Sequence, residues 1–425
     1  MTKVKILFIS YYYHQQTLTA TRNYYLSKAL ADAGYEVHVM GRMASDLVLP
    51  DKIKMHPVSA WDYRRILMFF GVRNGVTSSV VRPGRWIRWG YELLLTHPFN
   101  KWLAEGGGFY LNKARRTGLE ILGRHGITHL FSSYRPMADH FIAQDLKHKH
   151  PGLVWIGDFR DVLWMEKENP HYQEKWIRSL IRDMDHLTAV TRGVAEFWAS
   201  VYCKKAEVIY NGLPGKAVQA VPRQSPSEKF IINYTGMIYT LLQGAGVFFD
   251  VLRELCATED RFSESLSIQY SGLHANYWRT WMKQHGLLDW ASIRHQLPVN
   301  EALEKQTNAQ INLVLTWATL DVKGIIHGKF NEYLMARKPI LCLIEGDRDT
   351  ELEGIYRKLP NSLLAYNREE DKNLIRQFIL RHYRQWRQNG RVEEIPQEVL
   401  DSYDWSKQIK GIEAYLSKSF NSLIL

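Results

Sequence analysis

Residues 4–40 read VKILFISYYYHQQTLTATRNYYLSKALADAGYEVHVM, and their pattern of apolar residues indicates how the chain begins to fold. The stretch opens with an apolar run of strand length at residues 4–10. Residues 21–34 then carry apolar side chains at helical spacing, and the final glycine is a common helix terminator. Residues 36–40 form a second strand. Strand, helix and strand in this order predict a βαβ unit that opens a parallel sheet.

The same alternation continues through the rest of the chain in two series. The first series of apolar strands lies at residues 128–133, 153–157, 187–190 and 206–210. The second series lies at residues 230–236, 266–272, 292–297, 309–315 and 339–343, with a helix at 247–256. A stretch rich in proline, serine and small residues separates the two series at 213–227. We therefore predict an α/β protein with two Rossmann-like domains that face each other across a cleft.

The predicted domains are residues 1–215, with a basic aromatic insert at about 62–116, and residues 226–398. Residues 399–425 form a C-terminal helix that can pack back onto the first domain. A length of 425 residues with 45% hydrophobic content fits two globular domains. The three cysteines lie far apart without a CxxC spacing, which indicates neither a zinc site nor a disulfide framework and favours a reducing compartment.

The location of the protein follows from its hydropathy and its charge. The N-terminus resembles a strand more than a secretory signal, and no apolar window reaches the roughly 18 residues that span a bilayer. The net charge is +11, and much of the excess lies in the insert, where Arg85 and Arg88 flank Trp86 and Trp89. This mixture suits a helix in a lipid headgroup layer, but the tryptophans can equally face the domain core. We expect a cytoplasmic protein, peripheral on an anionic membrane. No nucleic-acid-binding motif is present.

Several short motifs give the chain a family resemblance. They are GDFRD at 157–161, LTAVT at 187–191, VIYNG at 208–212, YTG at 234–236, KG at 323–324 and GKFNEYL at 328–334. In this order and spacing they resemble bacterial glycosyltransferases of the GT-B fold, in the family 4-like group and its "DFRD" subset that makes surface polysaccharides. The resemblance covers nearly the whole chain. It implies that the first domain binds the acceptor and that the second binds a nucleotide sugar.

The resemblance assigns Glu332 to the donor site, where it would accept hydrogen bonds from ribose hydroxyls. A carboxylate can accept two hydroxyl donors, although an exposed glutamate stabilised by the helix dipole is a simpler alternative. The start of this helix would offer backbone N–H groups to a diphosphate. The further predicted donor-binding residues are Gly328, Lys329, Lys323, Gly236, Gln243 and His295. The chain departs from the family at Gly324, where a second glutamate is usual, and after Gly236, where an arginine and a lysine are usual.

The predicted catalytic residues are Asp158, Asp161 and His14. The two aspartates follow an apolar strand, so they should lie at its carboxyl end, one as general base and the other paired with Arg160. A structural aspartate–arginine turn is the alternative, and a solvated loop residue is the alternative for His14. Thr17 lies in the same first loop and, like Arg160, is assigned to acceptor recognition. We expect no metal and no cofactor.

The resemblance thus predicts a metal-independent, hexosyltransferase-like enzyme. It would move a sugar from a nucleotide-diphosphate sugar, with UDP favoured, to a lipid-linked or polysaccharide acceptor in bacterial surface polysaccharide synthesis. The basic aromatic insert would hold the first domain against the membrane. Two alternatives remain open: a sugar-nucleotide epimerase of the same fold, and a non-catalytic subunit that binds a nucleotide sugar.

Overall fold

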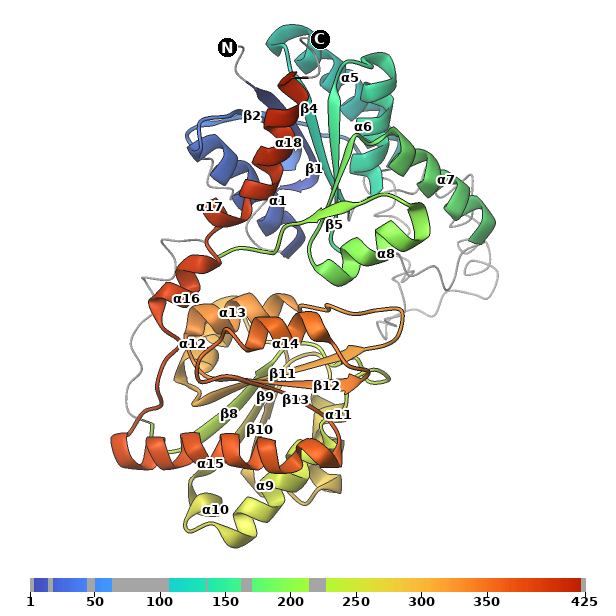
Figure 1. Cartoon of the computed structure of the whole chain (residues 1–425). Coiled ribbons are helices and arrows are strands. Elements are labelled where there is room, and N and C mark those ends of the chain that lie inside the picture. The colour runs from blue at the N-terminus through green and yellow to red at the C-terminus, as the bar shows by residue number, and fades with distance from the viewer. Residues whose placement is uncertain are drawn as a thin grey trace. The chain divides into compact units, whose positions relative to one another are not determined.

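The structure is a computed structural model of the chain, and it describes residues 4–13, 18–43, 50–62, 107–134, 137–161, 170–213 and 227–421 (Figure 1). Several residues singled out in the sequence lie outside these ranges, namely His14, Thr17, Arg85, Trp86, Arg88 and Trp89. The same holds for most of the predicted basic aromatic insert. No helix in the described ranges is long and apolar enough to cross a membrane.

The chain divides into two compact units. Unit 1 comprises Met1–Tyr210 together with Trp405–Leu425, and unit 2 comprises Asn211–Asp404. The predicted domain boundaries were 215/226 and 398/399. The first part of unit 1 ends five residues before the predicted 215, whereas unit 2 begins 15 residues before the predicted 226 and ends six residues after the predicted 398.

Unit 1 is built on one parallel sheet whose described strands run in the order β3-β2-β1-β4-β5-β6-β7. Its strands are β1 (Lys5–Tyr13), β2 (Glu36–Met43), β3 (Ile53–Pro57), β4 (His129–Tyr134), β5 (Val154–Phe159), β6 (His186–Ala189) and β7 (Ala206–Val208). Its helices are α1 (Leu18–Asp32), α5 (Gly107–His125), α6 (Met137–Lys149), α7 (Pro170–Asp183), α8 (Arg192–Tyr202), α17 (Trp405–Gln408) and α18 (Lys410–Asn421). The opening strand, helix and strand are present as predicted. The polar edge strand β3 was not predicted.

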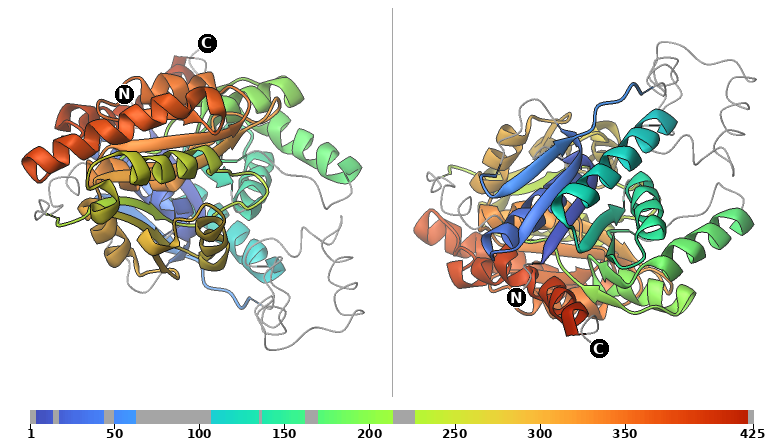
Figure 2. Two further views of the ribbon diagram at one scale, coloured as in Figure 1. Left: turned by 90° about the horizontal axis from the view of Figure 1, so that it is seen from below. Right: turned by 90° about the horizontal axis from the view of Figure 1, so that it is seen from above.

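Alternation along the strands of unit 1 produces two apolar layers, one on each face of the sheet. Leu7 and Met40 belong to the layer under α5 and α6, whereas Phe8 and Val39 belong to the layer that α1 covers. Helices α17 and α18 complete the second layer with buried apolar side chains, and Figure 2 shows the red C-terminal helices beside the blue strands. The C-terminal segment therefore contributes to the core of unit 1.

Unit 2 is built on a second parallel sheet, with described strands in the order β10-β9-β8-β11-β12-β13. Its strands are β8 (Phe230–Thr235), β9 (Leu266–Ser271), β10 (Ala291–Arg294), β11 (Ile311–Ala318), β12 (Ile340–Gly346) and β13 (Leu363–Tyr366). Its helices are α9 (Gly246–Thr258), α10 (Phe262–Ser265), α11 (Ala275–Gln284), α12 (Val299–Asn308), α13 (Gly328–Ala336), α14 (Thr350–Tyr356), α15 (Lys372–Asn389) and α16 (Gln397–Ser402). Both sheets are thus Rossmann-like. Among the described strands of unit 2, β13 is the one that the sequence did not predict.

We expect the C-terminal helix to matter for the stability of unit 1. Ile412 is 1% exposed in the layer above β1, so Ile412→Ala removes buried methyl groups and leaves a cavity. The substitution should lower the free energy of unfolding by about 2–4 kcal/mol, measured by urea denaturation. Lys407→Ala, at an exposed position of the same segment, is the control and should change the free energy of unfolding little. Equal stability of the two variants would contradict this role of α18.

Candidate functional site

A group of polar residues in unit 2 lies at the carboxyl edge of its sheet. Strand β8 ends at Thr235, its neighbour β9 ends at Ser271, and α13 begins at Gly328 after the adjoining strand β11. The carboxyl ends of parallel strands share one edge, which is where ligands bind in open α/β sheets. The element order therefore brings the YTG and GKFNEYL motifs together, although about ninety residues separate them in the sequence.

The turn after β8 requires glycine for two reasons. Gly236 has a φ of +123°, which other residues rarely adopt, and a Cβ atom there would lie 3.3 Å from the Cε and Nζ atoms of Lys329. The turn is held by two hydrogen bonds, from the Gly236 N–H to the Ser271 carbonyl at 2.8 Å and from the Tyr270 hydroxyl to the Gly236 carbonyl at 3.1 Å. The backbone of Gly236 and the amine of Lys329 are therefore close neighbours, as the predicted donor site requires.

The ammonium group of Lys329 is buried in an unusual environment. Its Nζ lies 3.7 Å from the centroid of the Tyr234 ring and has no hydrogen-bond partner among the described residues. Burial lowers the pKa of Lys329 to about 7, and the nearby Glu332 carboxylate offsets part of this effect. A buried cation with unused hydrogen-bond donors costs stability unless a ligand completes its shell. Lys329 can therefore donate to an anionic oxygen.

Glu332 is half-buried and stands on the same helix, so it is not the fully exposed helix-start residue considered above. Its Oε2 accepts a hydrogen bond from the Gln306 amide at 2.9 Å, and the same Gln306 nitrogen donates to the Thr235 hydroxyl at 2.8 Å. The Thr235 N–H in turn donates to the Tyr333 hydroxyl at 3.0 Å. This chain of hydrogen bonds orients the Glu332 carboxylate beside the turn after β8.

Gln243 was predicted to contact a diphosphate, but its side chain is buried and occupied by the protein. Its amide nitrogen donates to the Leu315 carbonyl at 2.6 Å and lies 3.4 Å from Nε2 of His327, while its oxygen accepts from the Tyr239 N–H at 2.9 Å. Gln243 therefore ties the loop after β8 to β11, and the structure gives it a positioning role in place of the predicted contact. Burial, with the charge of Lys329, lowers the pKa of His327 to about 3, so this residue before α13 stays neutral.

Gly324, which replaces the usual second glutamate, has a structural explanation. Its φ is +68°, and its N–H donates to Oδ2 of Asp349 at 2.7 Å. Asp349 also caps α14 by accepting from the N–H groups of Glu351 and Leu352. A glutamate at this position would be strained, so the departure follows from the local backbone.

The remaining predicted donor residues are placed differently. Lys323 is half-buried in the loop between β11 and α13. His295 is exposed after the edge strand β10, two strands away from β8. The structure thus gathers Gly236, Gly328, Lys329 and Glu332, and it leaves His295 at the sheet margin.

The DFRD motif in unit 1 forms a buried ion pair that differs from the predicted one. Asp158 is fully buried and accepts from Nε and Nη2 of Arg22 at 3.0 and 2.8 Å. It also accepts from the hydroxyls of Ser133 and Thr188, each at 2.7 Å. Burial raises the pKa of the Asp158 carboxyl, but the charge and hydrogen bonds of Arg22 outweigh it, so the pKa lies below its usual range.

These contacts correct the prediction for Asp158. A general base needs a lone pair that faces the substrate, and four hydrogen bonds occupy the Asp158 oxygens. The geometry therefore gives Asp158 a structural role in place of the predicted base. Its partner is Arg22, whereas Arg160 donates through Nε to the Tyr134 carbonyl at 2.7 Å. Asp161, the other predicted base, is exposed at the end of β5.

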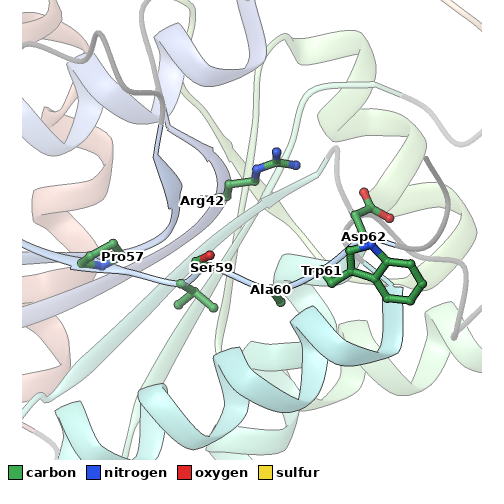
Figure 3. A pocket seen from close by; sticks show the side chains of 7 residues that line it. Arg42, Pro57, Ser59, Ala60, Trp61 and Asp62 are labelled. Carbon is green, nitrogen blue, oxygen red and sulfur yellow. The ribbon is translucent and has the colours of Figure 1, made fainter. Parts of the chain in front are cut away.

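A pocket of about 400 Å³ lies at the carboxyl ends of β2 and β3 in unit 1 (Figure 3). Its lining residues are Arg42, Pro57, Val58, Ser59, Ala60, Trp61 and Asp62. The Tyr11 hydroxyl donates to Oδ2 of Asp62 at 3.3 Å, and Nη1 of Arg42 approaches the same hydroxyl oxygen at 3.3 Å. The Trp61 side chain is 63% exposed. The pocket therefore combines charged groups with an accessible aromatic face, and no sequence motif pointed to it.

Comparisons with protein families and with curated proteins find no match. Among solved structures, the chain is similar to WaaG, a glycosyltransferase involved in lipopolysaccharide biosynthesis, with a TM-score of 0.50 and 11% identity over 96% of this chain and 98% of that one. It is similar to WaaB, a lipopolysaccharide outer core galactosyltransferase, with a TM-score of 0.56 and 12% identity over 98% of this chain and 100% of that one. A UDP-forming trehalose-phosphate synthase from Burkholderia vietnamiensis has a TM-score of 0.58 and 11% identity, covering 100% of this chain and 99% of its own.

The fold is that of GT-B glycosyltransferases. The two parallel Rossmann-like sheets and these structural neighbours confirm the predicted fold class. At such low sequence identity the likeness extends to the fold, so the site is argued from its own geometry.

We expect Asp158→Asn to destabilise unit 1 strongly, because it leaves the buried Arg22 charge without its partner. The free energy of unfolding should fall by about 3–5 kcal/mol in urea denaturation at pH 7. The pKa of Asp158 is lower in the folded protein than in the unfolded chain, so this stabilisation is complete above the ordinary carboxyl pKa and is lost as the pH falls below it. The difference in the free energy of unfolding between wild type and Asp158→Asn should therefore become smaller at acidic pH. A difference that is constant from neutral to acidic pH would refute the assignment.

Proposed function

We propose that the protein is a glycosyltransferase that moves a sugar from a nucleotide-diphosphate sugar to an acceptor hydroxyl. The observation that carries this proposal is the buried Lys329 ammonium, which has no hydrogen-bond partner among the described residues and lies beside the Gly236 turn. It stands in the first turn of α13, where free backbone N–H groups attract anions. A diphosphate would accept hydrogen bonds from Lys329 and from these N–H groups, and Glu332, three residues further along the helix, would bind hydroxyl groups of the ribose.

The acceptor would bind in unit 1, in the pocket of Figure 3. The exposed face of Trp61 offers an apolar surface to a sugar ring, and Arg42 and Asp62 can form hydrogen bonds with its hydroxyls. WaaG is described as involved in lipopolysaccharide biosynthesis and WaaB as a lipopolysaccharide outer core galactosyltransferase, which fits a lipid-linked or polysaccharide acceptor for this chain. The basic aromatic insert would contribute the attachment to anionic lipid.

In the proposed reaction an acceptor oxygen forms a bond to the anomeric carbon while the bond from that carbon to the diphosphate breaks. Lys329 and the N-terminus of α13 would stabilise the charge of the leaving diphosphate, which gives a route without a metal. The acceptor proton passes to a base. Asp161 and His14 remain the predicted candidates for that base. UDP is the proposed leaving nucleotide, following the family resemblance.

Titration calorimetry with UDP, GDP and CMP tests the donor site. One nucleotide should bind to the wild type, and Glu332→Ala should weaken it by about 1.5–3 kcal/mol, the usual loss for a hydrogen bond to a charged group. Glu398→Ala, at an exposed position of α16, is the matched control and should bind like wild type. If no nucleotide binds, or if Glu332→Ala binds as well as wild type, the donor site is elsewhere. Binding without transfer or hydrolysis would favour the non-catalytic alternative, and sugar turnover without an acceptor would favour the epimerase.

Lys329 should take up a proton when the nucleotide binds at pH 8. Its pKa of about 7 leaves it mostly neutral in the free protein at this pH, and an adjacent diphosphate favours the charged form. The phosphate itself is already deprotonated, since its second pKa is about 6. Calorimetry in buffers of different ionisation enthalpy should therefore show proton uptake, and affinity should fall as the pH rises from 7 to 9. Equal proton uptake by Lys329→Met would contradict the contact.

A further inference from the structure

Three histidines from distant parts of unit 1 meet on one face of its sheet. His38 lies on β2, His56 on β3 and His125 is the last residue of α5. One ring nitrogen from each lies within 4.8 Å of the others. The His38 and His56 rings are stacked with centroids 5.2 Å apart, and the His125 ring lies 4.6 Å from His38. The cluster is in the layer between the sheet and α5. It shares no residue with the assigned donor and acceptor sites, and His56 directly precedes Pro57 of the acceptor pocket.

Glu36 fixes the orientation of the central histidine. Its Oε1 lies 3.1 Å from Nε2 of His38 and accepts the N–H of that nitrogen. The lone pair of His38 is therefore on Nδ1, which faces Nε2 of His56 at 2.9 Å. Lys54 and Lys5 hold the carboxylate in turn, at 2.8 and 3.6 Å. A carboxylate behind a histidine is the usual arrangement that orients a metal-binding imidazole and raises its basicity.

The spacing of the nitrogens suits a small transition-metal ion. With metal–nitrogen bonds of about 2.0–2.1 Å, two ligands of a tetrahedral ion lie about 3.4 Å apart. The two close nitrogens at 2.9 Å would separate, and the third, which lies within 4.8 Å of them, would adjust to the same spacing. The neutral form of an imidazole, in which one ring nitrogen keeps its lone pair, is the form that binds such an ion.

The geometry points to a metal site formed by His38, His56 and His125, which would bind a divalent transition-metal ion such as Zn²⁺. Three imidazoles without a carboxylate ligand suit Zn²⁺, Co²⁺, Ni²⁺ or Cu²⁺, whereas Mg²⁺ and Ca²⁺ require oxygen ligands. A water molecule would take the fourth position. The ion would link the end of α5 to β2 and β3, which already pair with each other as neighbouring strands of the sheet. This inference is independent of the proposed transferase activity.

The test uses the full-length protein without a histidine tag, treated with chelator and then titrated with Co²⁺. We expect one Co²⁺ per chain, with the intense visible absorption of a four-coordinate ion, and displacement by Zn²⁺. His56→Ala and His125→Ala, at two half-exposed positions, should each weaken binding by about 100-fold or more. His150→Ala, at an exposed position after α6, is the matched control and should bind like wild type. Circular dichroism checks that the variants fold.

A second variant distinguishes a specific metal site from nonspecific binding to surface histidines. Glu36→Gln keeps all three ligands but loses the charged partner of His38, so Co²⁺ affinity should fall by about 10–100-fold while the absorption bands keep their shape. Zn²⁺ should also raise the melting temperature of wild type and not that of His125→Ala. Absence of stoichiometric binding, or equal binding by wild type and His125→Ala, would overturn the proposal and leave a purely structural histidine cluster.

Discussion

Unit 1 depends on the buried ion pair between Arg22 and Asp158. Withdrawing two charges from water is costly, and the cost is offset only when both are fully hydrogen-bonded. Here Ser133 and Thr188 complete the carboxylate, while Nη1 of Arg22 donates to the Ile209 carbonyl at 2.9 Å. The pair thereby joins α1 to β4, β5 and β6 and to the chain after β7.

The buried charge of Lys329 in unit 2 contrasts with this ion pair. Lys329 lies over the Tyr234 ring without a hydrogen-bond partner among the described residues, whereas nearby Gln243 and Thr235 are fully bonded. Folded proteins rarely leave a buried ammonium unsatisfied, because its desolvation is not repaid within the protein. The unused hydrogen bonds of Lys329 are explained if a bound anion accepts them. The two units thus show a closed polar network that stabilises the fold and an open one suited to a ligand.

The sequence predicted the features that depend on local pattern. Apolar runs located most strands, and the parallel topology then brought Gly236 near Lys329 and Glu332. The sequence did not predict the features that depend on packing between residues far apart in the chain. The partner of Asp158 is 136 residues away, so the nearby Arg160 was chosen instead. Strand β3 was missed because its sequence, IKMHP, is short and partly polar. The pocket and Gln306 follow from contacts that no spacing rule reveals.

The histidine cluster is another feature that the sequence did not predict. It also suggests that different regions of the sheet in unit 1 have different roles. Its members are 18 and 69 residues apart, so no metal motif can be recognised, and the cysteine count suggested no zinc. Parallel sheets place ligand-binding groups at the carboxyl edge, because the loops there are free to vary. His38 lies near the start of β2 and His125 ends the helix before β4, both away from that edge, whereas His56 is the last residue but one of β3. A metal held there would stabilise the attachment of α5 to the sheet without entering the reaction, which is why its loss should alter stability more than chemistry.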